Sequence, residues 1–175
     1  MHGNTVQLDP GVSPAPQAAA RAVDNAGVRL VVQSVGLNVP LGAINEVDGQ
    51  IVPPGFSSAY WVRNMGVSIQ ERASGTVYVV MHSLRNGGVG PGNYLADVAH
   101  GRSRLANGAT VALDGIEYAV TGSQLIDKAQ IAANTVVWAN TPDRLILITC
   151  LEHANGTPST QNLVITATLR TPVGG

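Results

Sequence analysis

The chain has 175 residues, which suits a single domain with a sizeable hydrophobic core. Its formal net charge is -1 and Lys128 is its only lysine, so the sequence offers no basic surface for nucleic acid. Charged residues make up only 12% of the chain, which together with frequent glycine, alanine and valine favours a globular β-rich domain over disorder or a helical bundle.

The first 27 residues read as a linker or wrapping arm. They are rich in Ala, Pro and Gln, and the prolines at 10, 14 and 16 disfavour a regular helix. The opening Met1-His2-Gly3 has neither the basic start nor the apolar core of a secretion signal, and no later run approaches the roughly 18 apolar residues of a membrane span. We expect residues 1–27 to be a linker behind a removed membrane anchor and residues 28–175 to be the folded domain.

From residue 28 onward, short apolar runs alternate with turn-forming residues, and Asp114-Gly115 is the strongest hairpin signal. The sequence predicts one surface helix over 93–100 and a second short helix within 124–141. The expected strands, in chain order, are 29–33, 37–41, 59–62, 76–82, 109–113, 116–121, 143–150 and 162–170. About eight strands with few helices indicate a mostly β, closed or nearly closed mixed barrel.

Two of the expected strands end on residues with catalytic potential. The apolar strand 143–150 ends on Cys150, the only cysteine in the chain, and strand 76–82 ends on His82. Reacting groups are often held where a rigid sheet meets a loop. A lone cysteine can also be a small buried hydrophobe, but a thiol and an imidazole are the minimum parts of a nucleophile and its acid/base partner.

These segments together resemble the sortases, the cysteine transpeptidases of Gram-positive cell surfaces. The run ending at Cys150 is similar to the family's Thr-Leu-x-Thr-Cys strand, with Ile146 in place of the first Thr. The run ending at His82 is similar to the strand of the catalytic histidine, with Met81 in place of the usual Gly. The resemblance spans roughly residues 28–170 and is strongest to the actinobacterial class E and class F members.

The resemblance implies an eight-stranded sortase-type barrel with one or two short helices, in which Cys150 is the nucleophile and His82 the general acid/base. It implies that an LPxTG-like sorting signal is cleaved between Thr and Gly through a thioacyl intermediate on Cys150. The expected partners are surface proteins that bear this signal and an amine acceptor of the peptidoglycan-precursor or pilin type. The expected location is the extracellular face of the cell membrane or the cell wall, with no cofactor, no metal, no nucleic acid, and membrane contact only through the removed anchor.

One departure from the family pattern is serious. Sortases carry a substrate-binding, oxyanion-stabilising arginine at the start of the strand after the cysteine, where this chain has Asn162 or, in the class F style, Thr160. Arg170 lies eight strand residues beyond Asn162, or ~27 Å away. Asn162 could donate an amide N–H to the oxyanion or could merely cap the loop, and Arg85 or Arg63 could supply the charge instead. We expect either a weaker catalyst or an arginine that arrives from elsewhere.

Other candidate residues read as structural. His100 and His153 are expected to be exposed loop histidines, although His153 follows the cysteine by three residues and could approach the thiol. Tyr60, Trp61 and Trp138 are expected to pack in the core or along a groove. Two alternatives to a transpeptidase stay open: a sortase-like module that only binds peptides, and a cysteine peptidase that hydrolyses them.

Overall fold

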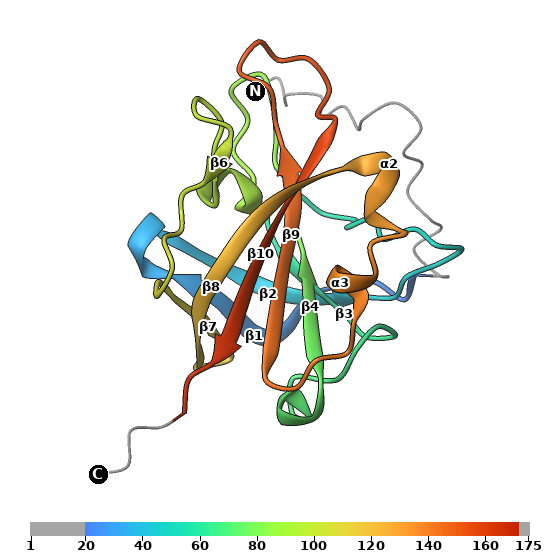
Figure 1. The fold of residues 1–175 in the computed structure, drawn as a ribbon. Coiled ribbons are helices and arrows are strands. Elements are labelled where there is room, and N and C mark those ends of the chain that lie inside the picture. The colour runs from blue at the N-terminus through green and yellow to red at the C-terminus, as the bar shows by residue number, and fades with distance from the viewer. Residues whose placement is uncertain (1–19, 172–175) are drawn as a thin grey trace.

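The chain folds into a closed barrel of eight strands, as the computed structural model, which describes residues 20–171, shows (Figure 1). Around the barrel the strands follow the order β1-β2-β3-β4-β9-β10-β8-β7, and β5 pairs with β6 in a separate small sheet. The strands are β1 Val23–Val32, β2 Leu37–Ile44, β3 Ala59–Val62, β4 Thr76–Val80, β5 Ala96–Asp97, β6 Arg102–Ser103, β7 Thr110–Leu113, β8 Ile116–Asp127, β9 Arg144–Leu151 and β10 Gln161–Leu169. Because β2 pairs with β3 and β4 with β9 in parallel while the other barrel pairs are antiparallel, the prediction of a mixed barrel is confirmed.

The helical elements are single turns. They are the 3₁₀ turns η1 Gln33–Val35, η2 Arg72–Ser74 and η3 Pro91–Tyr94, and the α-helical turns α2 Lys128–Ile131 and α3 Thr135–Trp138. Within residues 20–171, no helix has the length and apolar character that crossing a bilayer requires. Most of the predicted N-terminal linker falls on residues 1–19, which lie outside the described residues, and β1 begins at Val23.

The predicted surface helix over 93–100 is wrong. The chain forms η3 and then the short strand β5, and both Leu95 and Ala96 are buried in the barrel core. Asn93 is the physical reason, because its side-chain oxygen accepts hydrogen bonds from the backbone N–H groups of Leu84 and Gly90 while its amide donates to the Leu84 carbonyl. A side chain that bonds the backbone of a preceding loop competes with helix formation.

The predicted strands are present with altered bounds. The Asp114-Gly115 hairpin joins β7 to β8 with positive φ at both residues (52° and 74°), as a two-residue turn of this kind requires. β8 runs to Asp127, six residues beyond the predicted end, and pairs along its length with β10. β4 stops at Val80, two residues before His82.

Alternating side chains build two hydrophobic cores on either side of the strands β4, β9 and β10. The inner core fills the barrel and includes Val79, Leu147 and Leu163. The outer core lies on the opposite face, where Tyr78, Ile146, Ile148 and Val164 pack together with residues of α3. Cys150 continues the outer-face series that begins with Ile146 and Ile148.

Candidate active site

The parallel pairing of β4 with β9 brings the predicted catalytic pair together. Val80 pairs with Ile148, and the N–H of Met81 donates to the Ile148 carbonyl at 3.1 Å, which extends the ladder past the end of β4. Continued by two more residues, the same register leads to His82 after β4 and to Cys150 on β9. Adjacent strands lie ~4.8 Å apart, and partners in a ladder point to the same face of the sheet. The continued register therefore points to one end of the outer face for His82 and Cys150, which lie 68 positions apart in sequence.

Cys150 is the penultimate residue of β9 and is half-buried. Its antiparallel partner on β10 is Asn162, which is also half-buried, and the partner of Asn162 on β8 is Ile126. The thiol thus lies between the imidazole on the β4 side and the amide on the β10 side. Asn162 begins no loop and caps none: it is paired within the sheet on both sides, in the position predicted for an oxyanion donor.

His82 is held by the segment between β2 and β3. Its Nε2 lies 2.7 Å from the carbonyl oxygen of Pro53, and its ring centroid lies 4.9 Å from that of Phe56, with the planes tilted by 35°. A carbonyl oxygen can only accept a hydrogen bond, so Nε2 must carry the proton. The hydrogen bond at one ring nitrogen fixes the tautomer and leaves Nδ1 to exchange a proton.

A second link ties the two catalytic strand ends together on the inner face. Ser83 and Thr149, the neighbours of His82 and Cys150, are both buried and their hydroxyl oxygens lie 2.9 Å apart. Gly92 covers them, and a Cβ at that position would overlap both hydroxyl groups. Its N–H donates to the His82 carbonyl at 2.9 Å. The glycine-rich loop is therefore fastened to the site by its last glycine.

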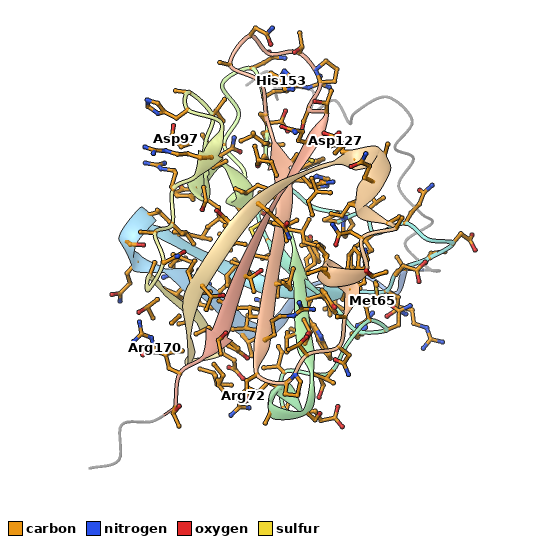
Figure 2. The ribbon with its side chains drawn as sticks, viewed as in Figure 1. Met65, Arg72, Asp97, Asp127, His153 and Arg170 are labelled. Carbon is orange, nitrogen blue, oxygen red and sulfur yellow. The ribbon has the colours of Figure 1, made fainter. Side chains whose placement is uncertain are left out.

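The structure separates several arginines from the thiol. Arg63 follows β3 and donates to the Asn45 side chain and the Arg21 carbonyl, at the opposite end of β3 from the residues that flank His82. Figure 2 shows Arg170 at one end of the barrel and His153, in the β9–β10 loop, at the other. Arg85 lies in the loop three residues after His82 and is half-buried. Of the two arginines proposed from the sequence to replace the family residue, Arg63 is thus excluded by position.

A row of three polar residues at this end of the barrel, two of them charged, is not predicted from the sequence. Continuing the ladders by one residue past Leu151, Gln161 and Asp127 places Glu152, Thr160 and Lys128 level with one another, just beyond the ends of β9, β10 and β8. Glu152 is buried, at 7% exposure, and Lys128 is half-buried. No local pattern predicts this row, because Lys128 lies 22 residues before the cysteine in a segment whose pattern favours a short helix and a loop.

The remaining candidates take the structural roles predicted for them. His100 is exposed and bonds to Asp97 at 2.9 Å, and His153 is exposed with its Nε2 3.4 Å from the Thr160 hydroxyl. Tyr60 is fully buried and its hydroxyl donates to Asp24 at 2.7 Å; burial first, and the Asp24 carboxylate second, raise the pKa of Tyr60 well above its ordinary value.

The two tryptophans also pack rather than react. Trp138 donates from its indole N–H to the Ile131 carbonyl at 2.7 Å and stacks 5.1 Å from Tyr78, and Trp61 packs against the inner core. Among residues 20–171, no three His, Cys, Asp or Glu side chains gather as metal ligands.

Comparisons with known proteins identify the fold. No protein-family model and no curated protein sequence matches this chain. Its structure is similar to sortase A of Listeria monocytogenes, with 22% identity, a TM-score of 0.56 and coverage of 82% of this chain and 86% of that one. It is similar to sortase C-1 of Actinomyces oris, with 15% identity, a TM-score of 0.56 and coverage of 98% and 90%. It is also similar to a pilus-related sortase C of Group B Streptococcus, with 16% identity, a TM-score of 0.57 and coverage of 83% and 67%.

Proposed function

We propose that this chain, which has the sortase fold, is a cysteine transpeptidase that cleaves an LPxTG-like sorting signal between Thr and Gly and passes the acyl part to an amine at the cell surface. The observation that carries the proposal is the parallel β4–β9 ladder, whose register leads to His82 and Cys150 on one face. A nucleophile beside an acid/base group that a third group orients is the arrangement that covalent acyl transfer requires.

The proposed reaction forms and breaks one bond at a time. The Cys150 thiolate attacks the Thr carbonyl carbon, a C–S bond forms, and the carbonyl electron pair moves to oxygen. When that oxyanion collapses, the Thr–Gly C–N bond breaks and the glycine amine leaves with a proton from His82. An incoming amine then attacks the thioester, gives its proton to His82 and releases the thiolate, so both catalytic groups return to their starting state.

The surroundings of His82 suit this role. Because the Pro53 carbonyl accepts from Nε2, the proton moves on and off Nδ1, and a positive charge on the ring is stabilised by the carbonyl dipole. Phe56 covers one face of the ring and limits its rotation. An imidazolium near the thiol lowers the pKa of a cysteine and so favours the thiolate at neutral pH.

The proposal also covers the substrates, the amine acceptor and the cellular location. Its substrates would be surface proteins that carry a sorting signal, and its acceptor would be a peptidoglycan-precursor or pilin amine. The domain would work at the extracellular face of the cell membrane or in the cell wall, and the residues before the barrel would connect it to an anchor. Classification within class E or class F remains a prediction from the sequence.

The test uses a fluorescently labelled LPxTG peptide. Incubation with the whole chain is expected to give an acyl adduct on Cys150 by mass spectrometry, and added triglycine is expected to convert the adduct to a ligated product. Cys150→Ala, whose fold is checked by circular dichroism, should give no adduct. A wild-type chain that binds the peptide without forming an adduct would replace this proposal with the peptide-binding module.

Water competes with the amine for the thioester, and the ratio of products separates transfer from hydrolysis. If triglycine leaves the cleaved product unchanged and yields no ligated peptide, the chain is a hydrolytic cysteine peptidase. The arginine missing from β10 is the specific observation that favours a weakened enzyme, since losing one oxyanion donor typically slows catalysis about 10²- to 10³-fold.

A further inference from the structure

We infer that Lys128 supplies the positive charge that stabilises the acyl oxyanion at Cys150, from the neighbouring strand rather than from β10, and this inference rests on the proposed transpeptidase function. The reaction builds a negative charge on the Thr carbonyl oxygen, and removal of one preorganised donor from such a site is costly. At the two β10 positions that match the family arginine, this chain has the neutral residues Asn162 and Thr160. The charge must then come from another element.

The β8–β10 ladder puts Lys128 directly opposite one of these positions. Gln161 pairs with Asp127, and the N–H of Lys128 donates to the Thr160 carbonyl at 3.0 Å. The Gln161 amide also donates to the Asp127 carboxylate at 3.1 Å, so this pair shares one face of the sheet. Because side chains alternate, Lys128 points to the other face, which it shares with Asn162 and Cys150.

The spacing fits a substrate carbonyl between the lysine and the thiol. Lys128 is two strand spacings across from β9 and two residues above the Cys150 row, which gives a Cα–Cα separation of ~12 Å. A lysine carries its ammonium on a flexible four-carbon stem. An ammonium on this stem that reaches toward the Cys150 row would face the carbonyl of an acyl group bound to the sulfur. Figure 2 shows Asp127, the residue before Lys128, where β8 passes β9 and β10 at the end of the barrel that also holds His153.

Lys128 also lies on the side of the Cys150 sulfur that is opposite His82. Strand order places β4 with His82 on one side of Cys150, and β10 and β8 with Asn162 and Lys128 on the other. The leaving amine and the oxyanion are bonded to the same tetrahedral carbon and point in different directions, so the proton donor and the anion-stabilising donors must lie on different sides of it. Arg85 lies three residues after His82, in the loop that follows β4.

Kinetics test this assignment first. Lys128→Gln is expected to lower kcat about 100-fold with little change in KM, while Lys128→Arg keeps activity within about tenfold of wild type. Thr160→Arg in the Lys128→Gln background, which moves the cation to the β10 position, should recover at least tenfold. Arg29→Gln removes a charge from exposed β1, on the opposite side of the barrel, and should behave as wild type. A Lys128→Gln enzyme within threefold of wild type, or a loss seen in Arg85→Gln instead, would overturn the assignment.

A second measurement needs no sorting peptide. The rates of Cys150 alkylation by iodoacetate and by iodoacetamide, which displace iodide at the same thiolate, differ chiefly in the charge of the reagent. A cation beside the thiol attracts the anionic reagent, so Lys128→Gln is expected to lower the iodoacetate-to-iodoacetamide rate ratio roughly fivefold. An unchanged ratio would show that the ammonium lies away from the thiol. If the wild-type chain acylates no peptide, the transpeptidase proposal fails, whereas this ratio still decides where Lys128 acts.

Discussion

The outer face of β4 and β9 carries a polar cluster at each end, and the two clusters differ in what their side chains do. At the amino end, Arg144 donates from its guanidinium to the carbonyls of Val136, Val137 and Ala139 and to the Thr76 hydroxyl. At the carboxyl end, six residues further along β9, stands Cys150 with the imidazole and the amide of its neighbouring strands.

The comparison distinguishes polar groups that hold the structure together from polar groups that are placed for chemistry. At the amino end every donor named above meets a backbone or hydroxyl acceptor, and the cluster fastens α3 against the outer core. The carboxyl end instead carries a thiol, an imidazole and an amide, all in half-buried positions. The β9 arginine is thus committed to structure, and the proposed oxyanion cation comes from another segment.

Replacing the imidazole should give the largest effect and should leave the scaffold intact. His82→Gln is expected to lower the rate of peptide cleavage about 10³-fold, because general acid–base catalysis typically contributes 10² to 10⁴. Its thermal melting temperature should stay close to that of wild type. Cleavage of the labelled peptide and a thermal melting curve measure the two effects on one sample. A His82→Gln variant that melts at a much lower temperature than wild type would show that the carboxyl end of the outer face also stabilises the fold.

Replacing the arginine at the other end should show the opposite pattern. Arg144→Met is expected to lower the free energy of unfolding by about 3 kcal/mol, because it leaves several carbonyls of the α3 segment without their charged donor. Urea denaturation provides the measurement, and Arg29→Met on the exposed face of β1 is the matched control, with an expected loss of about 0.5 kcal/mol. A stable Arg144→Met variant with poor turnover would place this arginine in catalysis instead.

The smallest predicted effect appears only at high pH and also belongs to the amino end. Burial raises the pKa of Tyr78, with Arg144 opposing the shift, and its hydroxyl donates to the carbonyls of Val137 and Ala139. The unfolded chain loses this phenol proton above about pH 10 while the folded chain keeps it. The stabilisation is therefore complete below that pH and declines as the pH rises beyond it.

The measurement is the slope of unfolding free energy against pH between 10 and 11. Tyr78→Phe should make this slope shallower by up to about 1.4 kcal/mol per pH unit, since one fewer proton is lost on unfolding. Tyr60 and Tyr118, whose pKa values burial also raises, keep the remaining slope steep. An identical slope in the variant would show that Tyr78 ionises equally in the folded and unfolded chains.

Local patterns in the sequence are sufficient to predict much of the fold. The β-branched run before Cys150, the alternation in β10 and the Asp114-Gly115 turn predict their elements because each depends on neighbours within a few residues. The extension of β8 was missed, since Gly122, Ser123 and Gln124 look like a loop until β10 is present to pair with them. The false helix after Pro91 arose in the same way, from a contact with the preceding loop.

The sequence by itself determined the strands, the thiol and imidazole at two of their ends, and the absence of the family arginine from β10. Tertiary structure alone decided that β4 and β9 run in parallel with the register that brings His82 toward Cys150, and that Lys128 faces Thr160. The reason is physical: strand formation follows from the alternation of neighbouring side chains, whereas register between strands is set by packing of the inner and outer cores over separations of more than thirty residues.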